Sequence, residues 1–163
     1  MQALALAGIG AGISLAFVAL SVYVPVMMLT FSVLAGTGVM LPLSRGYLRE
    51  GILCYIASAA LSLLFGPLRV IQFILGFGLW PLAVYLANVR FEPKRSVKIY
   101  YAVVYAAKLL YFNLIFWLVT VLLEIELRNP VFLFWVIANL AFLAYDLMIL
   151  NLFKLVKRYA KRK

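Results

Sequence analysis

The chain has 163 residues and a net charge of +10; 67% of its residues are hydrophobic and only 12% are charged. A water-soluble domain keeps about a quarter of its residues charged, so this composition excludes an ordinary soluble fold. It predicts an all-helical membrane protein, because the long apolar runs lack the apolar–polar alternation of membrane β-strands. The mean hydropathy of +1.10 agrees with lipid as the main solvent.

Proline, glycine and charge clusters divide the chain into six apolar runs, each of which we expect to cross a bilayer once. A hydrocarbon core about 30 Å thick needs about 20 helical residues, so six runs use nearly the whole chain. The first run starts without a basic segment, so we interpret it as a helix and not as a signal peptide. We expect one transmembrane domain over 1–153 and a basic cytoplasmic tail over 154–163. The predicted helices cover 3–22, 26–43, 50–65, 68–88, 98–123 and 131–153.

The basic residues predict the orientation of this bundle. All 15 except Arg69, Lys108 and Arg128 lie in the loops after helices two and four or in the tail. Cytoplasmic loops collect Lys and Arg, so we expect both termini on the cytoplasmic side of a bacterial inner membrane. The tail, KLVKRYAKRK, is expected to contact anionic lipid and not nucleic acid, because no nucleic-acid-binding fold surrounds it.

The chain lacks the residues that most catalytic and metal sites require. It has no histidine and a single cysteine, Cys54, which excludes an internal disulfide and zinc or haem sites built on these residues. Its five acids are scattered, and the sequence has no glycine-rich phosphate loop or Ser–His pair. We therefore expect no enzyme activity, no cofactor and no metal, and we interpret Cys54 as a packing residue.

Lys108 in the fifth predicted helix and Asp146 in the sixth are the most deeply placed ionisable residues. Counted from the cytoplasmic ends, they lie about 15 Å and about 12 Å into the membrane at roughly 1.5 Å per residue. A lone charge at that depth costs several kcal/mol, so we predict that the two side chains pair. The pair is either a structural contact that fixes helix register or part of a proton or ligand relay.

Polar and aromatic side chains nearer the outer leaflet predict a small-molecule pocket on helices four to six. Apolar walls with a few converging polar groups are typical of such pockets. The alternative is interfacial anchoring by the tryptophans and hydrogen bonding of the amides between helices. The segment GFGLWP, 76–81, predicts a kink in helix four. The candidate ligand-binding residues are Arg69, Gln72, Asn113, Trp117, Trp135 and Asn139.

The first predicted helix carries a ridge of small residues, Ala3, Ala7 and Ala11, beside a second ridge at Gly8 and Gly12. Small residues at every fourth position lie on one helix face and allow another helix to approach closely. The ridge serves either packing inside this bundle or docking of another subunit.

The chain resembles the substrate-binding S components of energy-coupling factor (ECF) transporters in size, in its six predicted helices and in the alanine ridge at its start. The segments GFGLWPLAVY (76–85), KLLYFNL (108–114) and ANLAFLAYDL (138–147) are also similar to a group of uncharacterised small bacterial membrane proteins. The resemblance to S components implies a vitamin-like micronutrient bound from outside. It also implies a transmembrane coupling subunit docked on Ala3, Ala7 and Ala11, and two ATPase subunits that drive release. The loop between helices one and two is shorter than the lid that the family often has there.

Three functional hypotheses follow. The leading one is a substrate-capture subunit of a transporter, energised by partners because the chain has no ATP-binding motif. The second is a membrane scaffold or accessory subunit that binds another membrane protein through helix one. The third is an ion- or proton-coupled carrier that acts through Lys108 and Asp146.

Overall fold

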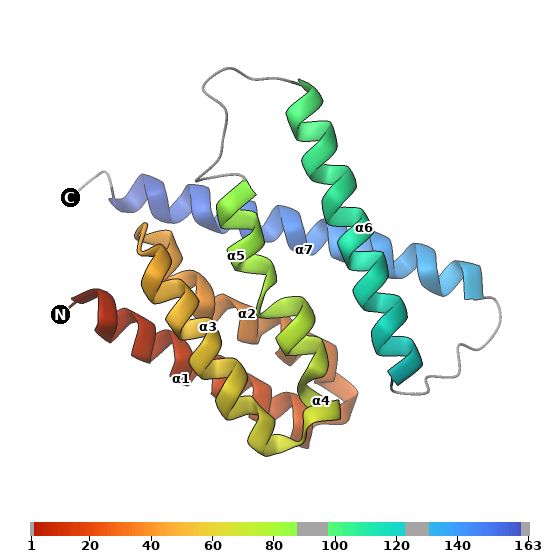
Figure 1. The fold of residues 1–163 in the computed structure, drawn as a ribbon, viewed down its shortest axis with the longest axis horizontal. Coiled ribbons are helices and arrows are strands. Elements are labelled where there is room, and N and C mark those ends of the chain that lie inside the picture. Colours follow the sequence, from red (N-terminus) through yellow and green to blue (C-terminus); the bar gives the residue numbers. More distant parts are fainter. Residues whose placement is uncertain (1, 88–97, 123–130, 161–163) are drawn as a thin grey trace.

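The structure, a computed structural model, describes residues 2–87, 98–122 and 131–160, and every regular element in these ranges is a helix (Figure 1). Short turns separate the first three helices, and a segmented fourth helix follows them. The elements are α1 (Gln2–Tyr23), η1 (Pro25–Met27), α2 (Met28–Ser44), α3 (Leu48–Ser62), η2 (Leu63–Phe65), α4 (Pro67–Ile71), η3 (Gln72–Phe77), α5 (Trp80–Tyr85), α6 (Lys98–Leu122) and α7 (Val131–Ala160).

The all-helical class predicted from the sequence is confirmed for the described residues, and the helices occupy the six expected regions. Four stretches are long and apolar enough to cross a membrane, which indicates a membrane-spanning protein. The second and fourth regions form shorter apolar helices, Thr30–Ser44 and Gln72–Tyr85. The four long stretches are Gln2–Tyr23, Leu48–Phe65, Tyr100–Val121 and Trp135–Leu155.

The last helix is longer than predicted. We expected it to end at residue 153, whereas α7 continues to Ala160. The apolar run does end there, but the following residues contain no proline or glycine that would stop a helix. The helical hydrogen bonds therefore continue into the basic segment.

Small residues let α1, α2 and α3 pack closely. The buried residues of α1 recur every three or four positions, as expected for one face of a helix. A Cβ added at Gly10 would collide with the Gly38 carbonyl oxygen of α2, so only glycine permits this approach. One turn further on, the Ser14 hydroxyl donates to the Ala35 carbonyl oxygen at 2.8 Å. The third helix joins them where buried Cys54 lies with its Sγ 3.9 Å from the Gly38 carbonyl oxygen.

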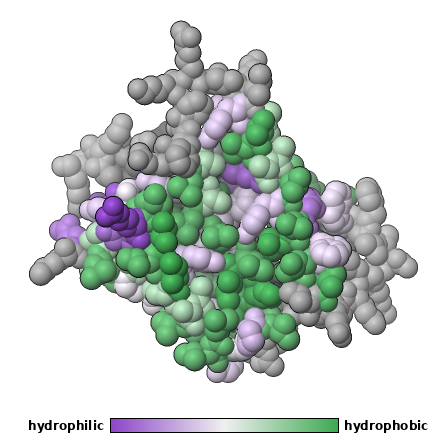
Figure 2. All heavy atoms as spheres, in the orientation of Figure 1, coloured by the Kyte–Doolittle hydropathy of each residue, from purple (hydrophilic) through white to green (hydrophobic). Residues whose placement is uncertain are grey.

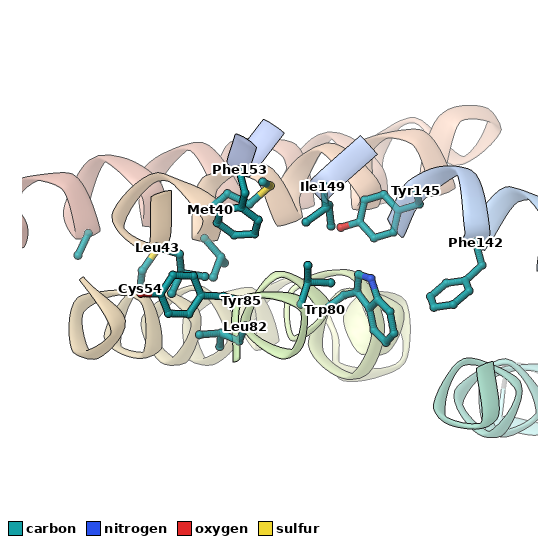
Figure 3. Packing of buried hydrophobic residues seen from close by; sticks show 13 residues of the cluster. Met40, Leu43, Cys54, Trp80, Leu82, Tyr85, Phe142, Tyr145, Ile149 and Phe153 are labelled. Atoms are coloured by element: carbon teal, nitrogen blue, oxygen red, sulfur yellow. The ribbon is translucent and has the colours of Figure 1, made fainter. Parts of the chain in front are cut away.

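The main hydrophobic core lies where α2, α3, α5 and α7 meet (Figure 3). Aromatic side chains of α5 and α7 pack together there, and the ring centroids of Tyr85 and Phe153 are 5.9 Å apart. The buried side chains labelled in Figure 3 are Met40, Leu43, Cys54, Trp80, Leu82, Tyr85, Phe142, Tyr145, Ile149 and Phe153.

The fourth helical region is interrupted, as its GFGLWP segment predicts. Its middle part, η3, is a π-helix, and the Gly78 amide donates to the Phe73 carbonyl oxygen at 2.7 Å, five residues earlier. Pro81, three residues after Gly78, has no amide hydrogen to donate to the Phe77 carbonyl oxygen. The backbone therefore changes hydrogen-bond register between α4 and α5, inside the bundle.

The outer surface is apolar over most of the face seen in Figure 2. The sixth helix, α6, crosses α7 beside the other helices (Figure 1) and exposes large apolar side chains along its length. Val103, Leu110 and Leu114 are each more than half exposed. Such a surface is typical of a helix in contact with lipid.

Candidate functional site

A buried ion pair links α6 to α7, as the sequence predicts. The Lys108 Nζ atom lies 2.9 Å from each carboxylate oxygen of Asp146. The Lys108 side chain is 7% exposed and that of Asp146 is 2% exposed. The Trp80 indole Nε1 donates to the Asp146 Oδ1 atom at 3.1 Å, and this third member was not predicted. A carboxylate that accepts three short hydrogen bonds is well compensated for its burial.

Aromatic rings enclose the ammonium group of Lys108. Its Nζ atom is 5.4 Å from the ring centroid of Tyr105 and 5.7 Å from that of Trp80, both within cation–π range. The ring of Phe142 stacks on Phe112 at 4.2 Å and meets Trp80 edge-on at 4.6 Å. The pair thus lies among low-polarity groups, which strengthen the attraction between the two charges.

The interruption of the fourth helix leaves backbone carbonyls without their usual helical donors, and tyrosines supply replacements. Pro81 cannot donate to the Phe77 carbonyl oxygen, and the Tyr145 hydroxyl donates to it at 3.3 Å. The Gly78 amide turns to Phe73, and the Ile74 carbonyl oxygen accepts from the Tyr55 hydroxyl at 2.7 Å.

A third tyrosine hydroxyl, from Tyr111 of α6, donates to the Leu75 carbonyl oxygen. The three tyrosines come from α3, α6 and α7, so three neighbouring helices hold the irregular segment in place. Tyr145 also directly precedes Asp146 in the chain, which ties the segment to the ion pair. The sequence signal for this arrangement was Pro81, but the tyrosines could not be assigned without the packing of the helices.

The predicted ligand-binding side chains have different partners in the structure. The Gln72 amide nitrogen donates to the Ser32 hydroxyl of α2 at 3.0 Å, and both residues are buried. Asn113 and Asn139 exchange amide hydrogen bonds of 3.1 Å and 3.3 Å between α6 and α7. These contacts match the alternative interpretation, in which the amides join helices.

The remaining three candidate ligand-binding residues are two exposed tryptophans and one arginine. Trp117 is 64% exposed and Trp135 is 44% exposed, which agrees with side chains at a membrane interface. Arg69 lies in α4, but its side chain is outside the described part of the structure. The structure therefore brings Asn113 and Asn139 together and orients Gln72 towards α2.

The alanine ridge on α1 lies partly inside the bundle. Ala7 is 5% exposed and belongs to the core, and Ala11 packs against that core. Gly8 and Gly12 are on the open face, where an added Cβ would have no atom within 4 Å. The face available to another molecule is thus the glycine ridge, and Gly10, which the sequence analysis did not single out, makes the closest helix contact.

Among the described residues, no group of three or more His, Cys, Asp or Glu side chains is placed to hold a metal ion. Comparison of the chain with protein-family models, curated proteins and solved structures gives no match. Functional inference therefore depends on the chain's own residues and their geometry.

Proposed function

We propose that the protein is the substrate-binding membrane subunit of an uptake transporter for a small, vitamin-like micronutrient, energised by partner ATPases. The observation that favours this function is the interrupted fourth helix beside the buried Lys108–Asp146 pair. Transporters commonly place solute sites at interrupted helices. Here tyrosine hydroxyls occupy the carbonyl oxygens of Ile74, Leu75 and Phe77, so in this proposal the solute binds these oxygens by replacing a tyrosine hydroxyl. An ionisable residue inside a membrane is also a candidate functional position.

The solute site in this proposal lies between η3 and α6. A Cβ added at Gly76 would meet the Ile115 Cγ2 atom of α6 at 4.0 Å, an ordinary van der Waals contact, so η3 approaches α6 here without a clash. The ion pair and the amides of Asn113 and Asn139 lie on the neighbouring helices α6 and α7. A partly polar, flat molecule fits a wall of this chemistry.

The proposed topology has six membrane crossings with both termini in the bacterial cytoplasm. This topology is supported by contacts that bring three chain segments together at one end of the bundle. A Cβ added at Gly46 would be 3.9 Å from the Tyr85 hydroxyl oxygen, and the Tyr85 ring packs on Phe153. The exposed cations Arg45 and Lys154 lie beside these contacts in the chain, so basic residues gather at this end. Such clustering is typical of a cytoplasmic face.

The resemblance to ECF S components supplies the proposed partners, a transmembrane coupling subunit and two ATPases. Because Ala7 and Ala11 pack on the core of the bundle, the coupling subunit in this proposal would dock instead on the open face formed by Gly8 and Gly12. Energy has to come from partners in this proposal, because the chain has no nucleotide-binding motif.

The test separates ligand binding from partner binding. Mass spectrometry of the purified wild-type protein should find one co-purified small molecule, and Gly76→Leu should reduce its occupancy at least tenfold, because its side chain would extend from η3 into the contact with Ile115 of α6. The matched control is Gly8→Leu, which adds the same side chain at an open position away from η3. Equal occupancy in all three proteins, or no small molecule with the wild type, would overturn the proposed solute site.

Partner binding is tested with Gly12→Trp. A bulky side chain on the open face of α1 should abolish co-purification of the ATPase subunits, whereas Gly76→Leu should leave it unchanged. If the wild-type protein captures no ATPase from its own cells, the energised-transporter proposal fails.

A second candidate function is a membrane scaffold or accessory subunit. It is favoured by Gln72, Asn113 and Asn139, because their amides bond to other helices of the same chain. In that case Gly12→Trp abolishes capture of a membrane partner, and the purified protein holds no small molecule for Gly76→Leu to displace.

A further inference from the structure

A hollow lies between the first turns of α1 and the turn that joins α2 to α3. Its volume is about 330 Å³, and it is open to the surface. One face of α1 lines it with Gln2, Ala5, Leu6 and Ile9, because Ala5 and Leu6 each lie three or four residues from both Gln2 and Ile9. The opposite side is formed by Arg45 and Tyr47.

The two sides of the hollow differ in chemistry. The α1 side is mainly apolar, through Ala5, Leu6 and Ile9. The other side offers a guanidinium group and a phenol, both of which donate hydrogen bonds. Among the residues that the structure describes, Arg45 has no ion-pair partner, so its charge is available to an anion. Glycine at position 46, with a backbone φ of 83°, turns the chain so that Arg45 and Tyr47 lie on the same hollow.

The surface next to the hollow continues it along α1. Ile9 is 58% exposed, and an added Cβ at Gly8 or Gly12 would have no atom within 4 Å. A shallow apolar track therefore leads away from Arg45 over the open face of α1. A headgroup with a hydrocarbon chain attached matches this arrangement, whereas a free phosphate would use only the Arg45 side.

We propose that this hollow binds the headgroup of an anionic phospholipid, with its phosphate on Arg45 and Tyr47 and one acyl chain along Ala5 and Ile9. The volume of about 330 Å³ suits a phosphate and glycerol unit, while the acyl chain continues outside it over α1. An anionic lipid fits better than a zwitterionic one because the described residues that line the hollow include no carboxylate to bind a choline or ethanolamine group. This lipid site is separate from the solute site beside η3, but its acyl chain lies on the open face of α1 where the coupling subunit is proposed to dock, so that subunit would displace the chain.

The experiment is a lipid titration of the purified full-length chain in detergent, followed by native mass spectrometry. Phosphatidylglycerol and phosphatidylcholine with the same acyl chains are the probes. We expect one phosphatidylglycerol to bind more tightly than phosphatidylcholine. Arg45→Gln should weaken the binding about fivefold, the effect of one interfacial cation on anionic lipid.

Two matched controls separate the hollow from general attraction to cations. Arg49→Gln removes an equal, exposed charge from the same region but leaves the hollow unchanged. Ala5→Trp fills the hollow and keeps Arg45, while Ala57→Trp adds the same ring at an exposed position of α3. We expect Ala5→Trp to reduce binding as Arg45→Gln does, and both control variants to bind as the wild type does.

Cross-linking then locates the lipid. Phosphatidylglycerol with a photoreactive group near its glycerol should label peptides that contain Ala5 to Ile9. Labelling confined to the basic tail, equal effects of Arg45→Gln and Arg49→Gln, or full competition by inorganic phosphate would each overturn the proposal. Loss of the co-purified solute with retained phosphatidylglycerol binding would contradict the proposed function and leave the lipid site intact.

Discussion

At the scale of single residues, the most informative feature is the group formed by Lys108, Asp146 and Trp80. The two charges compensate each other, and the indole N–H binds the same carboxylate oxygen as the ammonium group. Burial makes the pair sensitive to the loss of one member, because the remaining charge would have no counter-ion inside the bundle.

This sensitivity predicts the behaviour of paired substitutions. Lys108→Met should lower the free energy of unfolding by about 3–5 kcal/mol, because it leaves the Asp146 carboxylate buried with only Trp80 as donor. Asp146→Leu should have a similar effect, and the double variant should be more stable than either single one. The measurement is denaturation of the four proteins in detergent micelles, arranged as a double-mutant cycle. Losses that simply add would mean that the two residues act separately.

The sequence predicted this pair because depth and cost are general properties of charges in membranes. It could not predict Trp80 as the third member, since nothing in spacing shows which face of α5 meets α7. Asn113 and Asn139 illustrate the same limit: their polarity was evident, but whether they face a ligand or each other depends on helix rotation.

At the scale of elements, glycines decide how closely two helices approach. Gly10 and Gly38 lie where α1 and α2 cross, and a Cβ at either one would collide with the carbonyl oxygen of the other. Of the two small-residue ridges that the sequence predicted, Ala7 of the alanine ridge lies in the core, whereas Gly8 and Gly12 face outward. Spacing predicts a small-residue face, whereas the choice between neighbouring faces depends on tertiary packing.

Substitution of glycine by alanine should therefore lower stability on the packed face of α1 and leave it almost unchanged on the open face. Gly10→Ala and Gly38→Ala should each destabilise the protein by about 1–3 kcal/mol, because the backbones must move apart. Gly12→Ala, on the open face of the same helix, should change stability by less than about 0.5 kcal/mol. Thermal unfolding in one detergent compares the three variants. A loss at Gly12 as large as that at Gly10 would show that the open face is also packed.

The interrupted fourth helix makes a second prediction at this scale. A Cβ added at Gly78 would lie 2.9 Å from the Phe73 carbonyl oxygen, the acceptor of the π-helical hydrogen bond of Gly78. A Cβ added at Gly76 would make no contact shorter than 4.0 Å. Gly78→Ala should lower the melting temperature by several degrees and speed hydrogen exchange of the η3 amides, since about 1 kcal/mol corresponds to roughly 2–4 °C for a chain of this size. Gly76→Ala should change neither, and faster exchange in both variants would argue against this account of the break.

At the scale of the whole molecule, hydropathy predicted the helical class and the order of the helices, because apolar length is the main requirement for crossing a bilayer. The boundaries of α1 and α3 were close to those predicted, whereas α7 continued beyond the apolar run. Charge distribution predicted an orientation, and the contacts of Gly46, Tyr85 and Phe153 bring the neighbouring cations Arg45 and Lys154 to one end of the bundle.

The orientation itself is open to direct measurement. In a Cys54→Ala background, single cysteines replace Tyr23, Arg49 and Lys154, all three of which are exposed. A membrane-impermeant thiol reagent should label Tyr23→Cys in intact cells, because α1 ends there on the side opposite its start. Arg49→Cys and Lys154→Cys should react only after permeabilisation, since basic segments stay in the cytoplasm. If Arg49→Cys and Lys154→Cys reacted from opposite sides of the membrane, the chain between them would cross it an odd number of times. The topology with six crossings has an even number between these positions, so that result would contradict it.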